Sequence, residues 1–209
     1  MGANNGISAL GIHSILPLYQ IYSVEANPQH EQSLKSLKGK LANFDYKIVA
    51  AGNVSGSLKL HVAQYKSIPL HTAASVNPEY MTNAFINNYS EKVISKITWK
   101  FTIVDILPLD DLKLKPDLIK IDVEGFDFEV LMGLKVTIDE CRPSILIEYS
   151  PSQLNRFESF CIENRYGMYV YILGSNDFIK LFDYKKSHNH QKNLPLNIYL
   201  IPDEVYQDF

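Results

Sequence analysis

The fold of this chain follows from one short segment, residues 118–125, which reads Leu-Ile-Lys-Ile-Asp-Val-Glu-Gly. The segment begins as an apolar run with β-branched residues, which is typical of a buried strand, and it ends in two carboxylates and a glycine. Apolar residues then recur at helical spacing over residues 126–134. Because open α/β sheets bind ligands outside the carboxyl ends of their strands, Asp122 and Glu124 are candidate functional residues. The alternative is that both acids only cap the following helix.

The composition of the whole chain fits one globular domain with a sizeable core. The chain has 209 residues, of which 46% are hydrophobic and 21% are charged, and its formal net charge is -3. This weak acidity, without any basic cluster, argues against nucleic acid as a partner. Cys141 and Cys161 form no C-x-x-C pair, and we expect buried thiols rather than a disulfide or a nucleophile. No membrane segment or signal peptide is recognisable, so we expect a cytoplasmic location unless a targeting segment lies upstream.

Strands and helices alternate along most of the sequence, which predicts an α/β fold with a mostly parallel sheet covered on both faces. The expected strands cover residues 21–28, 46–51, 57–62, 100–104, 118–121, 144–149, 166–173 and 197–201. The expected helices cover residues 7–19, 29–42, 126–141 and 153–164. The last two strands have no good helix between them, so we expect them to pair antiparallel at an edge of the sheet.

Three polar segments are expected to be turns or loops. Residues 53–56 contain a glycine and are expected to join strand 46–51 to strand 57–62 as a hairpin. Residues 64–95 are rich in Asn, Ser and Tyr, and we expect a long loop with at most one helix, a candidate lid or binding loop. Residues 183–193 are expected to be a polar loop between the last two strands.

A glycine-bearing turn at residues 2–6, Gly-Ala-Asn-Asn-Gly, is the first candidate for cofactor binding. It precedes a helix, and its glycines allow a ligand to approach the backbone closely. Glu25 ends the next strand about 20 residues on, where a carboxylate can accept hydrogen bonds from both ribose hydroxyls of a nucleoside. The alternative for Glu25 is a solvated acid at the end of a strand. A nicotinamide-dependent oxidoreductase would use the same arrangement, although Asn4 stands where a dinucleotide fingerprint has its second glycine.

Six segments, in order along the chain, resemble the FkbM family of S-adenosylmethionine-dependent methyltransferases. They are Gly-Ala-Asn-Asn-Gly at 2–6, Val-Glu-Ala-Asn-Pro at 24–28, Ala-Ala at 50–51, Leu-Asp-Asp-Leu at 109–112, Lys-Ile-Asp-Val-Glu-Gly at 120–125 and Arg-Pro-Ser-Ile-Leu-Ile-Glu at 142–148. The resemblance reaches to about Pro151 and implies a class I, Rossmann-like three-layer fold with an antiparallel strand near its C-terminal edge. It also implies S-adenosylmethionine as cofactor and O-methylation of a hydroxyl on a small-molecule or glycan acceptor.

The resemblance also implies roles for individual residues. The expected cofactor-binding residues are Gly2, Asn4 and Gly6 at the methionine part, Glu25 and Ala26 at the ribose, and Ala51 at the adenine. Asp122 and Glu124 would face the transferred methyl group and the acceptor.

The acceptor hydroxyl needs help to lose its proton, because an alcohol is a poor nucleophile at neutral pH. Asp122 or Glu124 is the candidate base. The alternative is a divalent metal held by these two acids together with Glu148, which lies at the end of strand 144–149. We prefer the base, because no third oxygen ligand can be assigned from the sequence. His188 and His190 lie in a polar loop and are more typical of a solvated turn than of a metal site.

The chain departs from the family pattern at its start, because the strand that should precede the Gly-Ala-Asn turn is missing. That strand would be central in the sheet, and its loss would expose unpaired edges. We therefore expect residues 1–209 to form a single methyltransferase-like domain that is incomplete at the N-terminus. We also expect such a chain to bind the cofactor weakly and to be a candidate for an inactive protein. A non-catalytic domain that keeps the fold as an interaction surface is the remaining alternative.

Overall fold

The computed structural model describes residues 1–148, 151–187 and 197–206. The first elements along the chain are α1 (Ile7–Ile15), β1 (Ile21–Glu25), the 3-10 helix η1 (Pro28–His30), α2 (Glu31–Lys38), β2 (Phe44–Ile48) and β3 (Ala50–Gly52). They are followed by β4 (Gly56–Tyr65), β5 (Ile68–Ser75), α3 (Pro78–Asn88), α4 (Glu91–Ile94), β6 (Ile97–Pro108) and η2 (Leu109–Leu112).

The second half of the chain begins with the segment that was expected to organise the fold. Its elements are β7 (Leu118–Ile121), α5 (Asp127–Met132), α6 (Lys135–Cys141), β8 (Ser144–Glu148), η3 (Pro151–Gln153) and α7 (Leu154–Asn164). The chain then forms β9 (Tyr166–Ile172), β10 (Asp177–Lys180), α8 (Leu181–Ser187), β11 (Asn197–Pro202) and α9 (Asp203–Tyr206). The predicted α/β class is confirmed.

The described strands form mixed sheets in which parallel pairing does not predominate. They are ordered β1-β2, β3-β6-β4-β5 and β10-β9-β11-β8-β7. The parallel pairs are β1 with β2, β3 with β6, and β7 with β8. The predicted antiparallel pairing of the last two expected strands is confirmed, because β9 and β11 pair antiparallel, but the edge strand of that sheet is β10.

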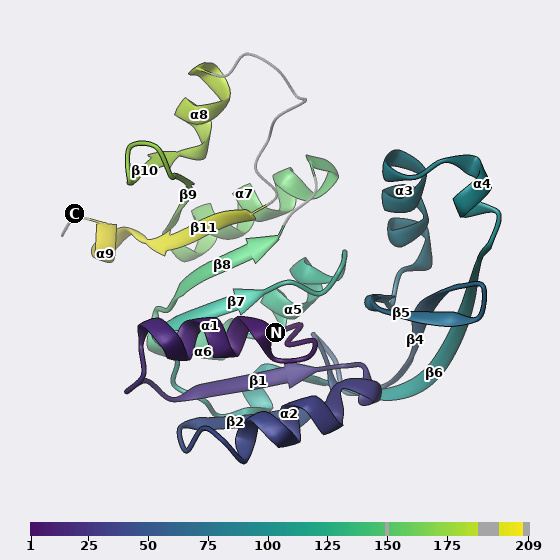
Figure 1. Cartoon of the computed structure of the whole chain (residues 1–209). Coiled ribbons are helices and arrows are strands. Elements are labelled where there is room, and N and C mark those ends of the chain that lie inside the picture. The colour runs from purple at the N-terminus through teal and green to yellow at the C-terminus, as the bar shows by residue number, and fades with distance from the viewer. Residues whose placement is uncertain (149–150, 188–196, 207–209) are drawn as a thin grey trace.

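Helices pack on both sides of the first strands (Figure 1). On one side, Leu34 and Leu37 of α2 and Ala9 of α1 form a small core with Phe44 of β2. On the other side, Val24 of β1 belongs to the largest core, which also contains the buried residues of β7, β8 and α5–α7. The strands there are Ile-rich, as expected for a sheet buried against helices. These two cores leave the carboxyl ends of β1 and β7 free to carry polar groups.

The first three residues lie between β1 and β7. The backbone N–H groups of Gly2 and Ala3 donate to the carbonyl oxygen of Val24, over 3.1 and 3.2 Å. The Met1 ammonium donates to the carbonyl oxygen of Lys120 on the other side. The short segment 1–3 therefore links two strands that do not pair with each other.

Residues 56–108 form a lobe of their own, which we call the β4–β6 lobe. It consists of β4, β5, α3, α4 and β6, and it stands to one side of the remaining elements in Figure 1. Its outer part has a separate core built around Ala63, Met81 and Phe85, with Trp99 packed against it. The prediction of a long loop over 64–95 was therefore wrong. Met81 and Phe85 are four residues apart and form the buried face of α3, but the surrounding Asn and Tyr residues masked that spacing.

Two further local predictions are corrected. Residues 53–56 do not form a hairpin, because β6 lies between β3 and β4, and Ile106 is opposite both Ala50 and Gly56. The helix expected over 126–141 is broken into α5 and α6 at Gly133. A β-carbon on Gly133 would lie 1.8 Å from the carbonyl oxygen of Gly52, so the two backbones meet there. The first correction follows from pairing between strands far apart in sequence, and the second from close packing of Gly133 on Gly52. A local sequence pattern shows neither feature.

The expected polar loop over residues 183–193 is only partly described by the structure. Residues 183–187 of the expected polar loop belong to α8, whereas 188–193, with His188 and His190, lie outside the described residues. Among the described residues, no helix has both the length and the apolar character that crossing a membrane requires. Cys161 is buried and Cys141 half-buried, and both are free thiols.

Candidate functional site

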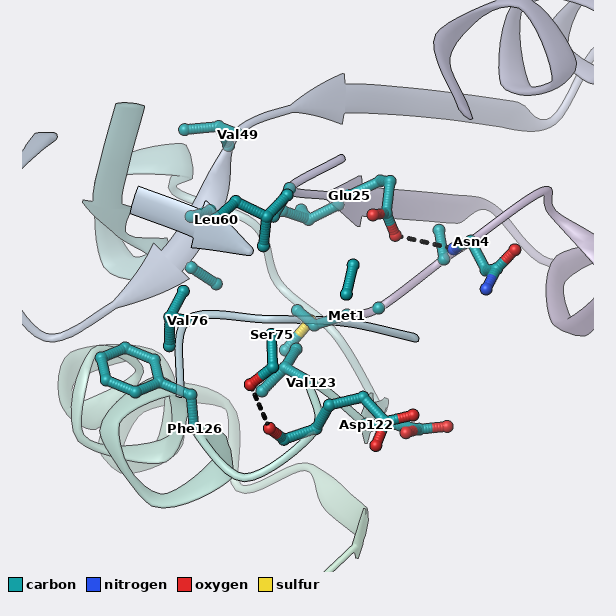
Figure 2. Close-up of a pocket in the computed structure, with 18 of the residues that line it drawn as sticks. Met1, Asn4, Glu25, Val49, Leu60, Ser75, Val76, Asp122, Val123 and Phe126 are labelled. Carbon is teal, nitrogen blue, oxygen red and sulfur yellow. Dashed lines mark hydrogen bonds between the residues drawn. The ribbon is translucent and has the colours of Figure 1, made fainter. Parts of the chain in front are cut away.

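A cavity of about 360 Å³ lies at the carboxyl ends of β1 and β7 (Figure 2). Seven of the residues that the sequence singled out line it, namely Gly2, Asn4, Glu25, Ala26, Ala51, Asp122 and Glu124. Of the nine predicted site residues, all of which are described, only Gly6 and Glu148 are not in the lining. The volume falls in the range of small-molecule sites, roughly 300–1,000 Å³.

Glu25 organises the turn at the start of the chain. One carboxylate oxygen accepts from the backbone N–H of Asn4 at 2.7 Å, and the other accepts from the N–H of Asn27 at 2.8 Å. The side chain is buried, with 7% exposed, so the alternative of a freely solvated acid is wrong. An ionised carboxylate has about four acceptor positions, and these two bonds leave acceptor capacity for a ligand.

The turn itself needs backbone conformations that favour glycine. Gly2 and Gly6 have φ angles of 72° and 90°, and Asn4 has 52°. Gly6 precedes the first residue of α1 and packs on α2, where a β-carbon would come within 2.9 Å of Leu37. Gly6 therefore shapes the turn from outside the cavity, whereas Gly2 and Asn4 face it.

The acidic side of the cavity follows β7. Asp122 forms a 2.6 Å ion pair with Lys120, and Glu124 is half-buried. Burial, together with the charges of Asp122 and Asp127, raises the pKa of Glu124 to about 7. Burial also raises the pKa of Glu148 to about 8, with further contributions from the nearby acids and from a side-chain hydrogen bond with Asp122. Glu148 thus belongs to the acidic cluster although it is outside the lining.

Asp127 is a structural partner of this cluster that the sequence reasoning did not assign. Its buried carboxylate accepts from the backbone N–H of Val123 at 2.9 Å and of Gly125 at 3.1 Å. Burial is the largest cause that raises the pKa of Asp127, and these two hydrogen bonds oppose it. The sequence did carry a signal, because an acid that opens a helix just after a glycine turn can cap that turn.

The β4–β6 lobe contributes a wall that the sequence reasoning also missed. Leu60 of β4 and Ala74 and Ser75 of β5 line the cavity, together with the following Val76. Ala74, Ser75 and Val76 fall in residues 64–95, which the sequence marked as a candidate lid or binding loop, whereas Leu60 lies in the expected strand 57–62 and was not assigned to a site. With Ala50, Ala51 and Phe126 they make this side of the cavity apolar.

Within the residues that the structure describes, no group of three or more His, Cys, Asp or Glu side chains is arranged to hold a metal ion. Lys120 occupies one side of Asp122 in an ion pair, and the acids Asp122 and Glu124 line the cavity beside it.

The cavity thus lies at the carboxyl ends of strands in an α/β fold, where open α/β sheets generally bind ligands. Residues 1–190 match the methyltransferase FkbM domain family, and the chain belongs to this family. Among solved structures, the crystal structure of methyltransferase FkbM from Methylobacillus flagellatus KT is similar, with a TM-score of 0.57 and 15% sequence identity. The similarity covers 95% of this chain and 41% of that chain, and at this identity it shows a shared fold. No curated protein matches the sequence.

Proposed function

We propose that the chain is an S-adenosylmethionine-dependent O-methyltransferase domain that acts on a hydroxyl of a sugar or another complex small molecule. One observation carries the proposal: Glu25 and the acids after β7 line a single cavity, with the Gly2 turn between them. Membership of the FkbM family supports a methyl-transfer reaction. In this proposal β2-β1 and β7-β8-β11-β9 are the two halves of a Rossmann-like sheet, joined by segment 1–3.

The cavity fits the proposed cofactor. Glu25 keeps acceptor capacity for the ribose hydroxyls, with Ala26 next to it. The apolar wall around Ala51 suits the adenine ring, and the backbone of Gly2 and Asn4 suits the methionine part. When bound, S-adenosylmethionine supplies a methyl group on a positively charged sulfur, and neighbouring carboxylates favour that charge.

Glu124 is the better candidate for the base. Asp122 is already paired with Lys120, whereas Glu124 has a pKa of about 7. A base works best when its pKa lies near the operating pH, because it is then partly ionised and still accepts a proton readily. In the proposed mechanism the Glu124 carboxylate takes the proton of the acceptor hydroxyl, while Asp122, held by Lys120, keeps the site negative. Glu148 lies close enough to the other acids that their charges help to raise its pKa.

Residues at the ends of both β1 and β7 line the cavity, which favours cofactor binding by this chain. Segment 1–3 bonds to Val24 and Lys120, so the wall between β1 and β7 is continuous. We therefore propose that this chain binds the cofactor measurably, and titration distinguishes this from the weak or absent binding that the sequence predicts.

Thermal unfolding with added ligands tests the proposal. A ligand that binds only the folded chain raises the melting temperature. We expect a rise with millimolar S-adenosylhomocysteine, no rise with NAD, and no rise with either ligand in Glu25→Gln. A rise with NAD alone would favour the oxidoreductase alternative, and no rise with either ligand would favour the non-catalytic one.

A further inference from the structure

A serine of the β4–β6 lobe is bonded to the backbone of the proposed base. The Ser75 hydroxyl donates to the carbonyl oxygen of Glu124 at 2.7 Å (Figure 2). It also accepts from the backbone N–H of Asn77 at 2.9 Å. Only 1% of Ser75 is exposed, so its hydroxyl is held within the fold and not on the outer surface. The hydroxyl donor is used and one acceptor position is filled, which fixes the orientation of the side chain.

Glu124 has a backbone conformation that needs such support. Its φ angle is 55°, in the left-handed region, which is unfavourable for a residue with a β-carbon. The Asp127 carboxylate holds the N–H groups on either side of Glu124, at Val123 and Gly125. Ser75 holds the carbonyl group of Glu124 itself. The strained residue is thus fixed by one anchor from α5 and one from β5.

We propose that Ser75 is a positioning residue that keeps the Glu124 carboxyl in the cavity. The inference deepens the proposed function and rests on Glu124 being its base. Without the hydroxyl, the carbonyl of Glu124 loses its buried partner, and the peptide group can rotate towards the unstrained conformation. The Glu124 side chain then leaves its half-buried position. The β4–β6 lobe also loses its hydrogen bond to the segment that follows β7.

The charge environment of Glu124 gives this role a specific readout. The groups that act on its carboxyl are Asp122 and Asp127, which disfavour ionisation, and Lys120, which favours it. Glu148 faces it from β8. Burial is the largest cause of its raised pKa, so a carboxyl released into water titrates at lower pH.

The test compares Ser75→Ala with Ser75→Thr, which keeps a hydroxyl, and with Ser95→Ala as control. The Ser95 hydroxyl also bonds a backbone carbonyl in the lobe, that of Lys92, but this bond lies at the exposed end of α4 and does not involve the acids after β7. The readout is the NMR titration of the Glu124 carboxyl carbon, assigned by its loss in Glu124→Gln. We expect Ser75→Ala to lower the titration midpoint by about 0.5–1 pH unit, which is a realistic shift for partial exposure of a carboxyl. Ser75→Thr and Ser95→Ala should keep the midpoint of the unsubstituted chain.

An unchanged midpoint in folded Ser75→Ala would overturn the proposal, and so would an equal fall in Ser95→Ala. If Ser75→Ala does not fold, Ser75→Cys takes its place, since a thiol has a similar shape but is a weak donor. Binding of S-adenosylhomocysteine to the unsubstituted chain is measured in parallel. If the unsubstituted chain does not bind S-adenosylhomocysteine but Ser75→Ala still lowers the midpoint, the proposed function is contradicted. The coupling between Ser75 and Glu124 is then still supported.

Discussion

Gly2 lies directly against the backbone of Asp122, because a β-carbon built on Gly2 would be only 1.7 Å from the Asp122 carbonyl oxygen. The turn proposed to hold the cofactor is therefore in contact with the loop proposed to carry out the chemistry. A side chain at position 2 cannot be accommodated without separating the two.

The first prediction follows from this contact. Gly2→Ala should weaken binding of S-adenosylhomocysteine at least about tenfold, or 1.4 kcal/mol, because the turn must move and φ is 72° there. Calorimetric titration measures the change. Gly11→Ala is the matched control, since a β-carbon on Gly11 meets no atom within 4 Å. It should leave binding unchanged and stabilise α1 by about 0.5–1 kcal/mol. Equal binding by both variants would contradict the proposed contact.

The second prediction concerns Glu25. Glu25→Gln replaces one acceptor oxygen with an amide group, which cannot accept from both Asn4 and Asn27. We expect a loss of about 1.5–3 kcal/mol in cofactor binding, the usual contribution of a hydrogen bond to a charged group. The exposed Glu31→Gln on α2 should bind as the unsubstituted chain does. Titration with S-adenosylhomocysteine distinguishes the two, and unimpaired binding by Glu25→Gln would exclude the ribose role.

The third prediction concerns the pH dependence of stability. The pKa values of Glu124 and Glu148 are raised from 4.5 to about 7 and about 8. The folded chain therefore keeps protons that the unfolded chain has released, and the free energy of unfolding should fall as pH rises from 4.5 to about 8. Glu148→Gln should make that fall shallower, as measured by urea unfolding across the range. The exposed Glu140→Gln should not, and a slope identical in all three proteins would refute the raised pKa values.

The fourth prediction concerns Asp127. Asp127→Asn keeps the shape of the side chain but leaves one of its two backbone N–H partners facing an amide group. We expect the free energy of unfolding to fall by about 1–3 kcal/mol, the cost of an unsatisfied buried group. Amide hydrogen exchange at Val123 and Gly125 should become faster at the same time. Asp139→Asn, at an exposed position of α6, should change neither quantity. Unchanged exchange at both amides would show that Asp127 does not hold the loop.

Most of the cavity lining could be predicted from the sequence, because an acid at the end of a strand marks each of its two sides. Glu25 is the last residue of β1 and Asp122 directly follows β7, and the carboxyl ends of strands are where open α/β sheets place ligands. The lobe wall was not predictable in this way. Ser75 acts through a contact with Glu124 that is remote in sequence, and β6 pairs with β3 although β4, β5, α3 and α4 lie between them along the chain. Such long-range pairing leaves no periodic pattern near the residues concerned.

A crystal structure of this chain grown with S-adenosylhomocysteine tests the central claim most directly. The account predicts ribose hydroxyls within hydrogen-bond distance of Glu25, the adenine against Ala51, and the sulfur on the side of Asp122 and Glu124. A ligand bound elsewhere on the chain, or bound in the cavity with its sulfur turned away from these two acids, would contradict it.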